Sequence, residues 1–157
     1  MTAVVPARDR EDDDLERFVR AQDDGGVYDA AVAELRRGRK TGHWMWFVFP
    51  QIAGLGFSVM SRRYALPSLD VAAAYLRHPV LGPRLLECAG IVAGIPDRSA
   101  EQIFGEVDAQ KLCSCMTLFA RTESGEVVFG LLLERYFDGR SDSGTDALLR
   151  ASLDPNP

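Results

Sequence analysis

Apolar residues recur three and four positions apart along most of this chain, the spacing of one face of an α-helix. Strand-like alternation is scarce. Ser68 can cap a helix that starts at Leu69, and Ser99 with Gln102 has the three-residue spacing of a capping box. Helices are expected from Asp14, Val27, Leu69, Pro79 or Pro83, Ser99, Asp108, Val127 and Thr145. We therefore predict an all-α fold, a compact multihelical single domain of about seven or eight helices.

The length of 157 residues suits one domain, and an apolar content of 46% is enough to build its core. We predict a disordered acidic tail over residues 1–12, one all-α domain over 13–150, and a second disordered tail over 151–157. Residues 9–24 hold eight acids and three bases, so they carry the whole net charge of -5. The remaining chain is neutral and has no broad field for a polyanion, which argues against nucleic acid as a partner.

A local exception is the run of Arg36, Arg37, Arg39 and Lys40. Cations suit the C-terminal end of a helix dipole, so one interpretation is a solvated helix end. The other is a corner that contacts an anion.

Three cysteines and two histidines do not form a spacing typical of a metal or redox site. We therefore predict no metal and no cofactor, and we expect the cysteines to be buried. No apolar run approaches the length that spans a bilayer, and no cleavable signal is recognisable at the N-terminus. These observations predict a cytoplasmic protein with no membrane partner.

Residues 43–51, His-Trp-Met-Trp-Phe-Val-Phe-Pro-Gln, form the most unusual segment. Four of the 14 aromatic residues, including both tryptophans, lie in residues 44–49. Pro50 disfavours helix at Phe49, so the segment is a short helix or an extended piece that ends there. One interpretation is that it forms the centre of the core.

The other interpretation is a site for a small anionic or nucleotide-like ligand, because cations beside aromatic rings hold planar anions by charge and stacking. In that site Arg39 or Lys40 meets an anion, Trp44 or Trp46 stacks on a ring, and His43 and Gln51 supply hydrogen bonds. The residues expected to contact the ligand are Arg39, Lys40, Trp44, Trp46, Gln51, Arg84 and Lys111.

Asp108 and Lys111 are three residues apart, which is typical of a surface ion pair on a helix. If their helix faces the aromatic segment, Lys111 contacts an anion and Asp108 becomes an acid or base. His43 and Asp108 are then the pair nominated for catalysis.

Four blocks carry a family resemblance: LERFVRAQ (15–22), ELRRGRKTGHWMWFVFPQIAGLG (34–56), YLRHPVLGPRLLEC (75–88) and IFGEVDAQKLCSCMTLF (103–119). Through them the chain is identified as a member of the domain-of-unknown-function 1810 family, a bacterial family often labelled calpastatin. The resemblance implies a compact, mainly helical fold and no established activity. Family members usually have serine where Gly42 and Cys115 stand here. True calpastatin is a disordered inhibitor, whereas a chain this apolar is expected to fold alone.

Short blocks, AQ near the start and HP-x-L before a leucine-rich helix, are faintly similar to NADAR proteins, which hydrolyse ADP-ribose linkages. Two functions therefore stay open. The first is a small-ligand-binding domain, whose finer form is a hydrolase acting on a nucleotide or ADP-ribose-like group. The second is a protein-interaction module without chemistry, marked by a filled core at 43–51 and an exposed apolar patch elsewhere.

Overall fold

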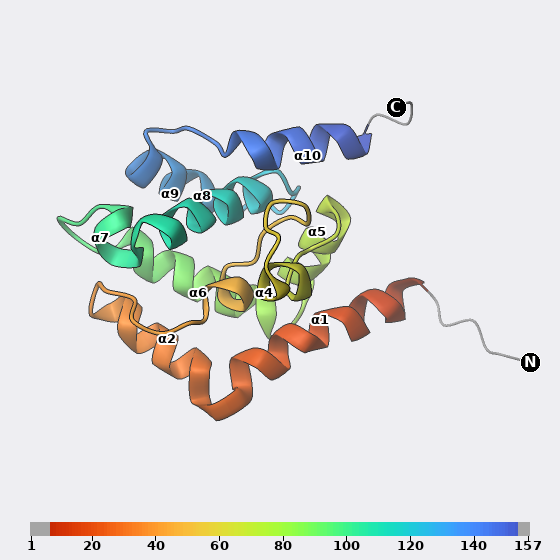
Figure 1. Cartoon of the computed structure of the whole chain (residues 1–157), viewed down its shortest axis with the longest axis horizontal. Coiled ribbons are helices and arrows are strands. Elements are labelled where there is room, and N and C mark those ends of the chain that lie inside the picture. Colours follow the sequence, from red (N-terminus) through yellow and green to blue (C-terminus); the bar gives the residue numbers. More distant parts are fainter. Residues whose placement is uncertain (1–6, 154–157) are drawn as a thin grey trace, which may run out of the picture.

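The computed structural model describes residues 7–153, and their side chains from residue 15 to residue 152 (Figure 1). The described part is all-α and holds ten α-helices and one 3-10 turn. They are α1 (Ala7–Asp23), η1 (Asp24–Gly26), α2 (Val27–Arg36), α3 (Met45–Val48), α4 (Val59–Arg63), α5 (Leu69–Arg77), α6 (Leu81–Ala93), α7 (Ala100–Phe104), α8 (Glu106–Ala120), α9 (Val128–Phe137) and α10 (Ser143–Leu153). Seven of them have nine residues or more, and the three short ones account for the excess over the predicted number.

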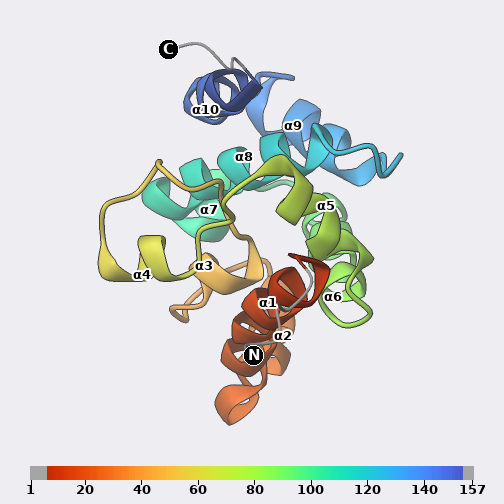
Figure 2. The same cartoon turned by 90° about the vertical axis from the view of Figure 1, so that its right-hand side faces the viewer.

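Helix α8 is the centre of the fold, and α5, α7, α9 and α10 pack around it. Residues 112–119 are all buried, as expected for a helix covered on every side. Its buried hydroxyls are satisfied within the helix: Thr117 donates to the Cys113 carbonyl at 2.8 Å and Ser114 to the Gln110 carbonyl at 3.1 Å. Helices α1 and α2 form a V on one side of the molecule (Figure 1), and α3 lies between α1 and α8 (Figure 2).

The predicted caps are confirmed. The Ser68 hydroxyl accepts from the Val71 N–H, and Ser99 with Gln102 forms a complete capping box. The aromatic segment adopts the short helix α3, which ends before Pro50.

Two boundaries differ from the expectation. Helix α1 starts at Ala7 rather than Asp14, inside the segment predicted as a tail, and acidic residues suit the first turns of a helix because of its dipole. Helix α10 continues to Leu153, into the predicted second tail. Residues 1–6 and 154–157 of those tails lie outside the described residues. No helix in residues 7–153 is long and apolar enough to cross a membrane.

Candidate functional site

Glu34, buried near the end of α2, fixes the loop that precedes the aromatic segment. Its carboxylate accepts hydrogen bonds from the backbone N–H groups of Thr41 and Gly42, both at 2.6 Å, and from the Trp44 indole at 3.2 Å. Burial acts to raise the pKa of Glu34, but these hydrogen bonds outweigh it and hold the pKa below its usual value. The Trp44 side chain is only 2% exposed, so its ring is a core element to which a ligand has no access.

A second group of charges joins this loop to α8. The Lys40 ammonium lies 2.8 Å from one Asp108 carboxylate oxygen and 5.0 Å from the centre of the Trp44 ring, and it also donates to the Gly42 carbonyl. The Lys111 ammonium lies 3.7 Å from the other Asp108 oxygen and 4.7 Å from the centre of the ring of Trp46. We call Lys40, Trp44, Trp46, Asp108 and Lys111 the lysine–tryptophan cluster. Each tryptophan in it has a lysine over its ring, and both lysines share one carboxylate.

The Trp46 side of the cluster has hydrogen-bonding capacity that the fold does not use. The indole N–H of Trp46 is buried and has no hydrogen-bond partner among the described residues. Trp46, Gln51 and Lys111 line a cavity of about 10 Å³, the size of one water-sized group. The Gln51 side chain makes no hydrogen bond to the described part of the chain, and an ammonium carries three donors. Phe49, Ser61, Tyr64 and Ala65 complete the lining. A group with an oxygen acceptor would match the donors of Trp46 and Lys111.

The other predicted site residues form no hydrogen bond or ion pair with this cluster among the described side chains. His43 is exposed, and no hydrogen bond joins it to Asp108 within residues 15–152. Arg39 is also exposed and lines a hollow with Asp97, Arg98 and Gln102.

Arg84 contacts a different part of the fold. Its guanidinium pairs with Asp23 at 2.9 Å, donates to Gln22 at 3.1 Å and lies 4.6 Å from the centre of the Tyr28 ring. The structure thus brings Lys40, Trp46, Gln51, Asp108 and Lys111 together, but not His43, Arg39 or Arg84.

Sequence reasoning missed Glu34, which organises the loop. A signal was available: Glu34 precedes Leu35 and lies three residues after Ala31, on the apolar stripe of α2. A carboxylate at the edge of such a stripe is expected to have a buried partner.

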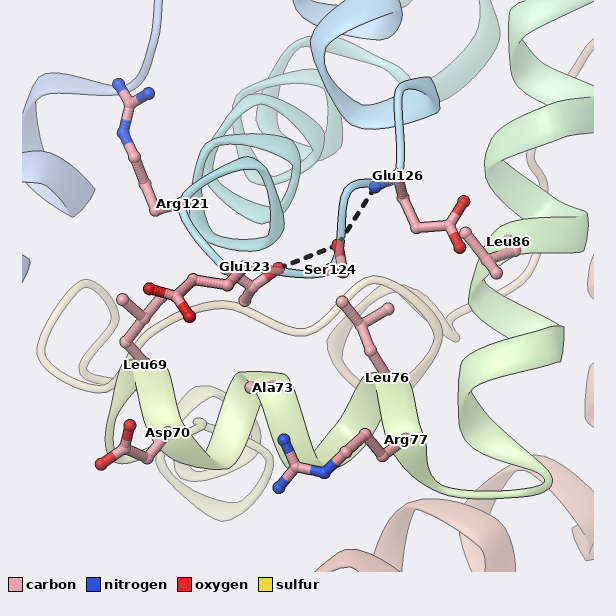
Figure 3. Close-up of a pocket in the computed structure, with 11 residues that line it drawn as sticks. Leu69, Asp70, Ala73, Leu76, Arg77, Leu86, Arg121, Glu123, Ser124 and Glu126 are labelled. Carbon is pink, nitrogen blue, oxygen red and sulfur yellow. Dashed lines mark hydrogen bonds between the residues drawn. The ribbon is translucent and has the colours of Figure 1, made fainter.

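The largest hollow lies elsewhere, between α5, α6 and the α8–α9 loop, with a volume of about 690 Å³ (Figure 3). We call it the leucine groove, since Leu69, Leu76 and Leu86 line it together with Ala73. Charged side chains also line it: Asp70, Arg77, Arg121, Glu123 and Glu126. Of these, Arg121 is held by Asp146 through two contacts of 2.9 and 3.0 Å, and no ion pair within residues 15–152 engages the other four.

The three cysteines are buried, as expected, and their burial disfavours the thiolate form. Burial raises the pKa of the Cys88 thiol to about 12 and that of Cys113 to about 11, and it raises the pKa of Cys115 well above its usual value. No group of three histidine, cysteine or acidic side chains in the described part of the chain is placed to hold a metal ion.

Fold and cluster together define a helical domain with a partly closed, cationic pocket beside its core. The chain belongs to the family described as "Protein of unknown function (DUF1810)", which residues 12–149 match. It is also similar to a solved structure, the conserved hypothetical protein Rv1873 from Mycobacterium tuberculosis. The two are 55% identical, the match covers 87% of this chain and 96% of the other, and the TM-score is 0.84. No curated protein matches the chain.

Proposed function

We propose that this protein is a small-ligand-binding domain that takes an anionic group at the Trp46 side of the lysine–tryptophan cluster. The observation that carries the proposal is the buried indole N–H of Trp46 without a hydrogen-bond partner. An unsatisfied buried donor costs roughly 1–3 kcal/mol, so a group that accepts from it gains that free energy on binding.

Charge and size favour a small anionic terminus. Lys40 and Lys111 share the Asp108 carboxylate, and the Glu34 carboxylate contacts the Trp44 side, so these charges balance. Lys111 is the cation that lines the cavity, and its contact with Asp108 is the longer of the two, so it is the partner that a bound anion would gain. The cavity of about 10 Å³ has room for one carboxylate or phosphate oxygen, while the remainder of the ligand would lie outside it.

A hydrolytic reaction on a nucleotide or ADP-ribose-like group stays a prediction. Asp108 is already paired with Lys40 and Lys111, so two cations engage its carboxylate before any substrate is bound. If His43 and Asp108 do catalyse such a reaction, H43A and D108N should each abolish release of product from ADP-ribose. Turnover equal to that of the native chain in both variants would remove these residues from the mechanism.

The binding proposal is tested by titrating the tryptophan fluorescence with acetate, inorganic phosphate, ADP and ADP-ribose. We expect saturable quenching by at least one of them, and loss of that quenching in W46F and K111M. R62A, which removes an exposed cation from the neighbouring helix α4, should bind as the native chain does. No saturable change at millimolar ligand, or an equal loss in R62A, would overturn the proposal.

The leucine groove favours a second candidate, a protein-interaction module. Three carboxylates, those of Asp70, Glu123 and Glu126, line an apolar floor beside the cation of Arg77, and none of the four has an ion pair with a side chain of residues 15–152. Charge complementarity therefore points to a basic, leucine-rich segment of a partner protein.

A synthetic helical peptide of alternating leucine and lysine pairs tests this candidate. Binding should be lost in L76K, which puts a like charge on the floor of the groove, and kept in V107K, on an exposed part of α8. Equal affinity for both variants would reject the groove as the docking site.

A further inference from the structure

Four arginines converge where α2 ends. Arg36, Arg37 and Arg39 surround the end of that helix, and Arg98 comes from the loop before α7. The Arg98 side chain packs against Gly38, which lies between Arg37 and Arg39 and has a φ of +78°. A methyl group added to Gly38 would lie only 3.4 Å from the Arg98 Nε atom. We call the four side chains the arginine corner.

None of these four side chains has an ion pair or hydrogen bond with another residue in the part of the chain whose side chains are described. One acid, Asp97, shares a hollow with Arg39 and Arg98 but forms no ion pair with either. The corner therefore has a net charge of +3 on a protein whose formal net charge is -5. Clustered guanidinium groups repel one another, and a multiply charged anion would relieve that repulsion.

The interpretation as a solvated helix end explains this arrangement poorly. The last carbonyls of α2, those of Ala33, Glu34 and Leu35, accept from the backbone N–H groups of Arg37, Arg39 and Gly38. At the end of α6, Arg135 donates to the carbonyls of Ala93 and Ile95. The carbonyls at both helix ends are satisfied by other groups, so the donors of the arginine corner remain available.

The corner opens into two adjoining hollows that share Arg98. The first, of about 540 Å³, is lined by Arg36, Arg37 and the apolar side chains of Ile91 and Ile95. The second, of about 430 Å³, is lined by Arg39, Asp97 and Gln102. Both volumes lie in the range of small-molecule sites.

We propose that the arginine corner binds a small molecule that carries a diphosphate group. A guanidinium fork matches two phosphate oxygens, so Arg98 contacts both phosphoryl groups while Arg37 and Arg39 hold one each. The apolar wall of the first hollow then accommodates the organic part of the ligand. This proposal shares no residue with the lysine–tryptophan cluster and does not rest on the function proposed for it.

Isothermal titration calorimetry at 50 mM salt tests the proposal with inorganic pyrophosphate, ADP and inorganic monophosphate. All titrations use W46F and variants made in it, because W46F removes the anion site proposed at the lysine–tryptophan cluster. In this background we expect one pyrophosphate and one ADP per chain, with ADP bound more tightly because of the apolar wall, and monophosphate at least tenfold weaker. R98A should weaken pyrophosphate at least tenfold, and R98K should also weaken it because lysine lacks the fork. R62A should bind with the same affinity as W46F alone.

Three results would each overturn the proposal. One is the absence of binding by pyrophosphate or by ADP at millimolar concentration. Another is an equal loss of affinity in R98A and R62A, which would indicate general attraction to a cationic surface. The third is tighter binding of a short single-stranded RNA than of ADP with the same dependence on Arg98, which would make the corner a nucleic-acid surface. The circular dichroism spectrum of each variant, expected to be native, excludes unfolding as the cause.

Discussion

The two tryptophans of the aromatic segment are two residues apart and have matching surroundings, yet the fold uses them differently. Each has a lysine ammonium over its ring, and both lysines contact Asp108. The Trp44 indole donates to Glu34, whereas the Trp46 indole N–H has no partner among the described residues. The same residue type therefore serves the core at one position and leaves binding capacity at the other. Burial of a tryptophan is not evidence for or against a site until its N–H has been traced.

The largest loss of stability should come from removing the buried Trp44 ring. W44A leaves a large cavity in the core and is expected to lower the free energy of unfolding by about 3–5 kcal/mol, measured by urea denaturation. W44F keeps most of the volume and removes one hydrogen bond, so it should cost roughly 1 kcal/mol. A small effect of W44A would mean that this ring is not part of the core.

The contribution of the Glu34 carboxylate to the free energy of unfolding should depend on pH in the acidic range. Its pKa is lowered in the folded chain, so its contribution to stability is present above the unfolded pKa and is lost as the pH falls through the folded pKa. E34Q should be less stable than the native chain at pH 7, and the difference should shrink below about pH 4. Urea denaturation between pH 3 and pH 7 measures this, and a difference that does not change with pH would contradict it.

Substitutions of Lys40 and Lys111 should lower the free energy of unfolding by different amounts, because the two side chains are buried to different extents. The Lys40 side chain is 6% exposed and that of Lys111 is 20% exposed. K40M removes the closer and more buried partner of Asp108 and is expected to cost about 2 kcal/mol. K111M removes a longer contact and should cost less than about 1 kcal/mol. If K40M and K111M lower the free energy of unfolding by the same amount in urea denaturation, burial does not distinguish the two lysines.

The smallest effect on stability should come from W46F. It replaces the indole by a smaller phenyl ring and deletes a donor that no described residue accepts from. Relief of the unsatisfied donor offsets the lost packing, so the free energy of unfolding should change by less than about 0.5 kcal/mol, in contrast to W44F. A loss as large as that of W44F would mean that the Trp46 N–H is satisfied in solution without any added ligand.

The helices could be predicted because their signals are local. Apolar spacing and the serine caps at Ser68 and Ser99 are short-range features, and both caps are present in the structure. The early start of α1 could not be predicted in this way, since the acidic residues before Asp14 have no apolar period. Helix α4 was also missed, because it has five residues and its signal is the single cap at Ser58.

Part of the site could be predicted from composition, and its geometry could not. Placing Asp108 and Lys111 against the aromatic segment needed only the assumption that α8 faces it, and the ion pair with Lys40 confirms that contact. The difference between the two tryptophans could not be predicted, because it depends on contacts between residues distant in the sequence. The Trp44 indole donates to Glu34, ten residues earlier, whereas the Trp46 indole N–H has no partner among the described residues. The convergence of Arg98 with Arg37 and Arg39 lies in the same category, because some 60 residues separate them in the chain.

The carboxylate shared by the two lysines links the environments of both indoles. A ligand that draws Lys111 away from Asp108 also alters the electric field over Trp44, which no ligand touches. The sealed indole is then an intrinsic reporter whose emission wavelength shifts with occupancy on the other side.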